Sequence, residues 1–293
     1  MESAILSESD FRRFRELIYA KAGIALADVK LHLMQSRLQR RLRHHHLSSF
    51  GEYYSLLTES PASDDETRAF INCVTTNTTS FFREPHHFDF VSKKILPEMD
   101  ELARMRAIEP RLRIWHAGCS TGEEPYSLAI TLRNALARLH CDWNVLQLAT
   151  DIDTDVLAHA ERGVYEEDRI ERVPGDLRRS SFLRGKGANN HLYKIKREFR
   201  DQIVFRQINL LEAWPFREST RFDMIWCRNV IIYFDRPTQK RLFARFAGLI
   251  KPGGYLFIGH SESLLGITDA FEPAGQTIYR KPPDCAARGM RAA

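Results

Sequence analysis

The chain has 293 residues, of which 43% are hydrophobic and 28% are charged, so it can bury a substantial core and has room for two domains. No apolar run approaches the length of a membrane span, and the N-terminal stretch lacks a signal-peptide pattern, so we expect no membrane insertion. Five scattered cysteines without a C-x-x-C pair argue against a disulfide framework or a zinc site and favour a reducing cytoplasm.

The first part of the chain is predicted to be all-helical. Ser7 and Asp10 form a capping pattern before apolar residues at helical spacing, and the chain breaks at residues 21–24. No strand alternation is found before residue 110, which predicts an all-helical N-terminal domain over residues 1–85. The helical segments predicted after the break are 29–46, 49–57 and 64–73.

Strands and helices alternate in the rest of the chain, which indicates an α/β domain with a mostly parallel sheet over residues 86–281. Charged, glycine-containing sequence at 166–202 interrupts the alternation and predicts a small inserted subdomain with antiparallel strands at 181–184 and 191–196. We expect the tail, 282–293, to be disordered. The predicted elements are strand 112–117, helix 125–139, strand 144–149, helix 153–161, strand 203–208, strand 222–227, helix 236–249, strand 254–259 and strand 276–280.

The stretch 114–130 predicts a binding site where a strand turns into a helix. Small residues from Gly118 to Gly122 break the strand, and Pro125 suits the first turn of the helix. Glycines at such a turn let the backbone approach a ligand where a Cβ would clash. Glu123 and Glu124 would repel a phosphate, so they favour a ligand that carries positive charge or hydroxyls.

Asp151 closes the next strand, 29 residues after Gly122. In Rossmann-like sheets an acid at this place binds the ribose hydroxyls of an adenosine. The turn reads G-x-x-x-G and not G-x-G-x-x-G. An adenosine without pyrophosphate and with a nearby cation, as in S-adenosylmethionine, therefore fits better than NAD.

Two other polar segments are candidate parts of the site. Residues 74–84 place Asn77, Thr79 and Arg83 between the two domains. They predict either a capped turn with aromatic anchors or a polar lid, in which Arg83 would supply a cation for a carboxylate. Residues 227–229 fall at the carboxyl end of a strand, the edge where open α/β sheets bind ligands. Tyr233 follows, either packing the next helix or facing the ligand.

The helix predicted at 29–46 carries Arg37, Arg40, Arg41 and His44 on one face. Such a face is either solvated or a docking surface for an acidic partner.

Seven segments, in chain order, carry a resemblance to a known family. They are TTNTTSFFR, AGCSTGEEPYS, TDID, INLLE, CRNVIIYF, KPGGYLFIGHSES and GQTIY. Together they resemble the chemotaxis receptor methyltransferases of the CheR family, from about residue 8 to residue 281. The resemblance implies an α/β fold: a Rossmann-like S-adenosylmethionine-dependent methyltransferase domain, an all-helical N-terminal domain and a small inserted antiparallel β-subdomain. It also implies methyl transfer to glutamate side chains of receptors, which yields glutamyl methyl esters and S-adenosylhomocysteine.

The resemblance further implies roles for single residues. Glu123 matches the acidic contact after the glycine turn that begins at Gly118, with Glu124 beside it as the alternative. The basic helix matches a receptor-binding helix through Arg37, Arg40 and Arg41, and the inserted subdomain matches one that can grip a short peptide at receptor C-termini. The other matches are Asn77, Thr79 and Arg83 on the cofactor, Asp151 on the ribose, Asn209 and Leu210 near the adenine, Cys227, Arg228 and Asn229 in the loop that closes the pocket, and Tyr233 near the methyl-transfer centre.

A receptor glutamate is already ionised near neutral pH, so the reaction needs no general base. We expect positioning groups instead (Arg83, Arg228 and Tyr233), no metal, and a cytoplasmic monomer without a nucleic-acid partner. Two other classes stay open. A nucleic-acid methyltransferase would suit the basic isoelectric point, although CRNVIIYF is not the N/D-P-P-Y type of loop that serves a flipped base. A cofactor-binding regulator without catalysis is the second.

Overall fold

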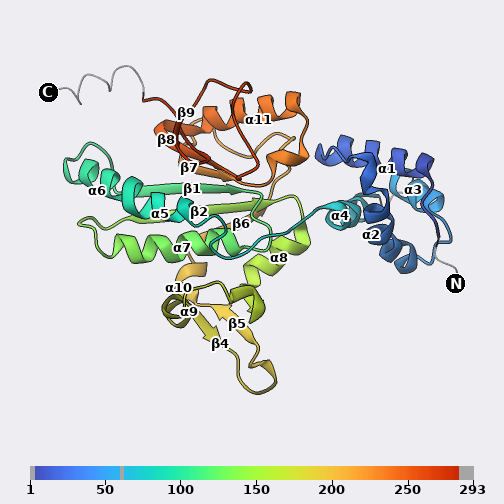
Figure 1. Cartoon of the computed structure of the whole chain (residues 1–293), viewed down its shortest axis with the longest axis horizontal. Coiled ribbons are helices and arrows are strands. Elements are labelled where there is room, and N and C mark those ends of the chain that lie inside the picture. Colours follow the sequence, from blue (N-terminus) through green and yellow to red (C-terminus); the bar gives the residue numbers. More distant parts are fainter. Residues whose placement is uncertain (1–3, 60–62, 284–293) are drawn as a thin grey trace.

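A computed structural model describes residues 4–59 and 63–283. It confirms the α/β fold class, with a helical N-terminal unit beside the sheet and a small subdomain projecting from it (Figure 1). Within the described residues, no helix has both the length and the apolar character needed to cross a membrane. The predicted disordered tail lies outside the described residues from 284 onward.

The four N-terminal helices pack around a shared aromatic core. Phe14 is wholly buried there, with the rings of Tyr53 and Phe70 at 5.9 and 5.7 Å from its own. The Ser7 hydroxyl accepts the Asp10 N–H at 3.0 Å, which confirms the predicted cap, and Gly23 ends the first helix at a φ of +70°. The helices are α1 (Glu8–Ala22), α2 (Leu31–His44), α3 (Phe50–Glu59) and α4 (Ser63–Val74).

The main sheet has seven strands in the order β6-β2-β1-β7-β8-β10-β9. The first five run parallel, whereas β10 is antiparallel to both β8 and β9. The chain passes from β1 to β2 on one side and later adds β7 on the other, so the switch point of the sheet lies between β1 and β7. The strands are β1 (Arg111–Ala117), β2 (Asn144–Asp151), β6 (Ile203–Gln207), β7 (Phe222–Cys227), β8 (Ile250–Ile258), β9 (Glu272–Gly275) and β10 (Ile278–Arg280).

Both faces of the sheet are covered. Trp115 and alternate strand residues pack against α11, whereas Ile114 and its alternates pack against the helices on the other face. Two strands differ from the prediction: β8 begins four residues earlier, and β9 was missed because its sequence, EPAG, has no apolar alternation. The covering helices are α11 (Arg236–Leu249), α5 (His86–Phe90), the π-helical turn Val91–Ile95, α6 (Leu96–Arg104), α7 (Glu123–Leu136) and α8 (Thr154–Arg162).

The inserted subdomain is a three-stranded antiparallel sheet in the order β3-β5-β4. Its predicted strand pair is confirmed, and a third strand precedes it. Phe182 of this subdomain packs its ring 5.4 Å from Phe81 of the interdomain linker, so the insertion is anchored to the α/β domain. Its elements are β3 (Val164–Glu166), α9 (Gly175–Ser181), β4 (Phe182–Arg184), β5 (Leu192–Ile195) and α10 (Arg197–Arg200).

Candidate cofactor site

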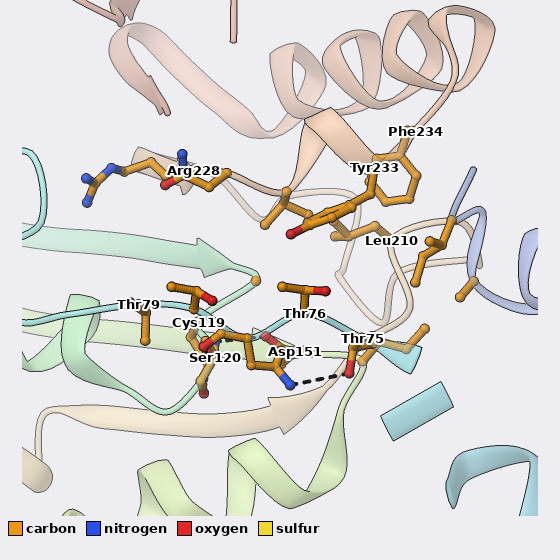
Figure 2. A pocket seen from close by; sticks show the side chains of 18 of the residues that line it. Thr75, Thr76, Thr79, Cys119, Ser120, Asp151, Leu210, Arg228, Tyr233 and Phe234 are labelled. Atoms are coloured by element: carbon orange, nitrogen blue, oxygen red, sulfur yellow. Dashed lines mark hydrogen bonds between the residues drawn. The ribbon is translucent and has the colours of Figure 1, made fainter. Parts of the chain in front are cut away.

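A pocket opens at the carboxyl edge of the parallel strands, at the switch point of the sheet (Figure 2). Its walls come from the linker 74–79, the turn after β1, the end of β2, the loop 208–210 and the loop 228–234. The turn between α1 and α2 forms a further wall through Ile24 and Leu26. The site is thus built by both domains.

The glycine turn brings backbone to the pocket wall. Gly118 has a φ of +96°, and a Cβ there would lie 2.3 Å from Cγ2 of Val230, which also lines the pocket. Two residues on, the Ser120 N–H donates to Asp151 Oδ2 at 2.8 Å and ties the turn to the end of β2. Only glycine at position 118 lets the backbone come this close to Val230 and the pocket.

Asp151 lies buried at the end of β2, on the pocket wall. Its Oδ1 accepts the Asp153 N–H at 3.0 Å, and Oδ2 accepts the Ser120 N–H. Burial outweighs these hydrogen bonds and raises the pKa of Asp151 to about 6. A carboxylate offers about four acceptor positions, so two remain for ligand hydroxyls.

The polar linker is fixed from below by Asp153, the N-cap of α8. Asp153 Oδ2 accepts from the Thr75 hydroxyl and from the Asn77 amide, each at 2.7 Å. Asn77 also donates weakly to Thr75 at 3.3 Å, as Figure 2 shows. The Asn77 side chain therefore shapes the pocket wall by holding the linker, while Thr79 lines the pocket farther along.

Charged groups of both signs line one end of the pocket. Glu124 Oε2 accepts from Arg228 at 3.0 Å, and Arg228 also donates to the carbonyl of Arg83 at 2.5 Å. The Arg83 guanidinium donates to the carbonyl of Thr78 at 2.9 Å. An anion-binding arginine and a cation-binding glutamate at one place match the two charges of an amino-acid group.

The loop after β7 presents Tyr233 to the pocket. The Tyr233 carbonyl accepts the Ala25 N–H at 2.8 Å, so the helical domain holds this loop. Its hydroxyl points into the open space above Thr76, whereas the guanidinium of Arg228 points the other way (Figure 2). Asn229, at a φ of +58°, lines the pocket with its N–H donated to Glu262 at 3.0 Å.

The structure does not bring two of the predicted residues to the pocket. Glu123 is wholly buried, where its carboxylate pairs with Arg169 of the insertion and accepts from Thr121 at 2.6 Å. Neighbouring residues of a helix point in different directions, so Glu124 and not Glu123 faces the pocket. Cys227 points into the core beneath α11, where burial raises the pKa of its thiol.

Two arginines of the basic helix also make contacts within the protein. Arg37 donates to the carbonyls of Val74 and Thr75, the latter at 3.0 Å, so it supports the linker. Arg41 pairs with the buried Glu66. Charge reversal at Arg37 and Arg41 therefore cannot isolate receptor docking, because both arginines hold the protein together. Arg40 is exposed and contacts the Cys73 sulfur at 3.3 Å.

The remaining predicted residues line the pocket, although the Asn209 side chain makes a structural hydrogen bond. Its amide donates to the Lys21 carbonyl at 2.8 Å and thus joins the β6 loop to α1. The sequence analysis did not predict the apolar wall, which Ile24, Leu26 and Ile152 form. The break after Gly23, with two apolar residues outside any helical period, was the only signal.

Comparison with known proteins decides the family. Residues 77–280 match the CheR methyltransferase SAM-binding domain, and residues 9–75 match the CheR methyltransferase all-alpha domain. The chain belongs to the CheR methyltransferase family. Chemotaxis protein methyltransferase 2 of Pseudomonas aeruginosa is 46% identical over 93% of each chain. The chemotaxis protein methyltransferase of Escherichia coli is 42% identical, over 97% of this chain and 94% of its own.

The cofactor of this CheR methyltransferase is S-adenosylmethionine, and the pocket fits it. Two free acceptor positions on Asp151 suit ribose hydroxyls, apolar side chains from both domains suit the adenine, and Arg83 and Glu124 suit the amino-acid group.

Binding of S-adenosylhomocysteine is expected to weaken as the pH falls from 7 to 5. Only the ionised form of Asp151 keeps both free acceptors for the ribose hydroxyls, and its pKa of about 6 lies in this interval. Calorimetric titration across this range measures the effect, with Asp151→Asn as control. The variant, which cannot ionise, should bind about tenfold more weakly at pH 7, without this pH dependence. Equal pH profiles for the two proteins would remove Asp151 from the ribose site.

Proposed function

We propose that this CheR methyltransferase esterifies glutamate side chains of chemotaxis receptors and releases S-adenosylhomocysteine. The observation that supports this best is the pocket itself, which Arg83, Glu124 and Asp151 line and into which the Tyr233 hydroxyl points above Thr76. The names of the relatives, chemotaxis protein methyltransferases, support a receptor as the substrate.

The proposed roles follow the walls of the pocket. Asp151 binds the ribose, and Leu210 with Ile24 flanks the adenine. At the charged end, Arg83 binds the carboxylate of the amino-acid group and Glu124 binds its ammonium. Asn77, Thr79 and Asn229 complete the wall beside the reacting atoms.

The residues of this chain position the reactants and do not act as general acid or base. S-adenosylmethionine supplies a methyl group on a positive sulfonium, and the receptor carboxylate is an ionised nucleophile at neutral pH. The Tyr233 hydroxyl donates a hydrogen bond that orients this carboxylate, and the apolar walls exclude water. We assign no role to a metal.

Radiolabelled S-adenosylmethionine mixed with receptor-containing membranes tests the reaction. The expected result is label on the receptor that mild base releases, since carboxyl esters hydrolyse readily whereas methylated amines do not. Receptor in which the modified glutamates are replaced by glutamine serves as control and should stay unlabelled. Base-stable label, or label only on added nucleic acid, would contradict the proposal.

We also propose that the insertion helps to hold the receptor. Both outer strands of the order β3-β5-β4 leave an edge, and Leu183 on β4 is 55% exposed. Such an edge can accept an extended peptide by strand addition. In the same assay, receptor without its C-terminal tail should be methylated more slowly, and a matching pentapeptide should compete only with the tailed receptor. Equal rates for both receptors would leave docking to other surfaces.

A further inference from the structure

A histidine lies in the sheet directly behind the charged end of the pocket. His116, on β1, is wholly buried, and its Nδ1 lies 2.8 Å from Oε1 of Glu124. Its Nε2 lies 2.9 Å from the side-chain oxygen of Gln147, a wholly buried residue on the adjacent strand β2. The three side chains form a line from the sheet interior to the pocket wall.

The chemistry of these partners places the protons. Carboxylate oxygens only accept, so Nδ1 of His116 carries a hydrogen and donates it to Glu124. The Gln147 amide nitrogen is buried without a partner among the described residues. Rotating this amide by 180° lets its nitrogen donate to Nε2, which suits a neutral imidazole. In either orientation of the amide, the Nδ1–H of His116 donates its hydrogen bond to Glu124.

Glu124 is therefore held by two donors from different segments of the chain. His116 binds one carboxylate oxygen, and Arg228, just beyond β7, binds the other at 3.0 Å. Because both carboxylate oxygens are held, the three side-chain torsions of Glu124 are restricted before any ligand arrives. A preorganised carboxylate spends no free energy on ordering when a cation binds.

We propose that His116, oriented by Gln147, is a positioning residue that aims Glu124 at the ammonium of the amino-acid part of S-adenosylmethionine. This inference rests on the role proposed above for Glu124. It assigns a binding effect to a side chain that touches no ligand and lies behind the wall of the pocket.

Two ligands separate positioning from mere packing. S-adenosylhomocysteine carries the ammonium, whereas 5′-methylthioadenosine keeps the adenosine and lacks the amino-acid group. His116→Leu removes the donor at a similar volume, whereas His116→Asn is smaller but keeps a donor near the Nδ1 position. Calorimetry should show the Leu variant binding S-adenosylhomocysteine about tenfold more weakly, with methylthioadenosine affinity unchanged. The Asn variant should bind both ligands within about twofold of wild type.

Each other outcome decides against one of the two ideas. Equal losses for both ligands, or equal losses in the Leu and Asn variants, would make His116 a structural residue and overturn the inference. If Glu124→Gln binds S-adenosylhomocysteine as wild type does, the proposed role of Glu124 fails instead. Should the His116 variants not fold, Gln147→Met applies the same test, with a smaller loss expected for S-adenosylhomocysteine alone and an unselective result overturning the inference.

Discussion

An Arg228→Met variant is expected to lose about 3–5 kcal/mol of stability and most of its methyl transfer. The Arg228 side chain is only 2% exposed, with Glu124 at 3.0 Å and Glu84 at 3.3 Å. Methionine fills much of the space but leaves two nearly buried carboxylates without their cation. Urea unfolding, followed by the fluorescence of Trp226, whose ring lies 5.6 Å from the guanidinium, measures the loss.

The pH dependence of stability provides a second test of the ion pair between Arg228 and Glu84. Burial alone would raise the pKa of Glu84, but the charge of Arg228 and hydrogen bonds from His260 outweigh it and lower the pKa from 4.5 to about 2. This stabilisation is complete above pH 4.5 and is lost as the pH falls toward 2. The difference in free energy of unfolding between wild type and the Met variant should therefore become smaller as the pH falls over that interval. Arg228→Lys, which keeps the charge, should recover part of the stability, and a Met variant as stable as wild type would contradict the argument.

Arg41→Glu is expected to destabilise the helical domain by about 3–5 kcal/mol and to lower methylation for that reason alone. Arg41 Nε donates to Glu66 at 2.9 Å, and Glu66 also accepts from Tyr53 at 2.6 Å and from His45 at 2.7 Å. Burial would raise the pKa of Glu66, but these hydrogen bonds lower it to about 2, so the variant sets two carboxylates against each other. The midpoint of thermal unfolding measures the loss.

Arg43→Glu is the matched control on the same helix. Arg43 is exposed and makes no side-chain hydrogen bond or ion pair within the described residues. Its reversal should change stability by less than about 0.5 kcal/mol. If the positive charge of α2 attracts the receptor, this variant should methylate receptor more slowly at low salt and match wild type at high salt. Equal loss of stability in the two variants would contradict the assigned difference between Arg41 and Arg43.

Sequence patterns predicted which segments form the site because apolar runs show where each strand ends. Asp151 and the loop from Arg228 lie where parallel strands end, and such ends meet at one edge of a sheet. The same patterns could not choose between Glu123 and Glu124. That choice depends on the rotation of α7 about its axis, which is set when Tyr126 and its neighbours pack against the insertion.

The internal contacts of the basic helix could not be predicted for a different reason. A sequence gives the charge of Arg37 and Arg41 but not what each faces. Glu66 and the Thr75 carbonyl come from segments far along the chain and reach these arginines only after folding. The sequence therefore could not show that Arg37 and Arg41 also make contacts within the protein.

Two walls of the cofactor pocket belong to the helical domain and the others to the α/β domain. A ligand that contacts both domains stabilises the contact between them, because it binds only when the two domains are packed together. Bound cofactor is therefore expected to raise the free energy needed to separate the two domains. For the same reason the helical domain cannot be exchanged as an independent unit, because a graft that loses Ile24 or Arg37 changes the cofactor site.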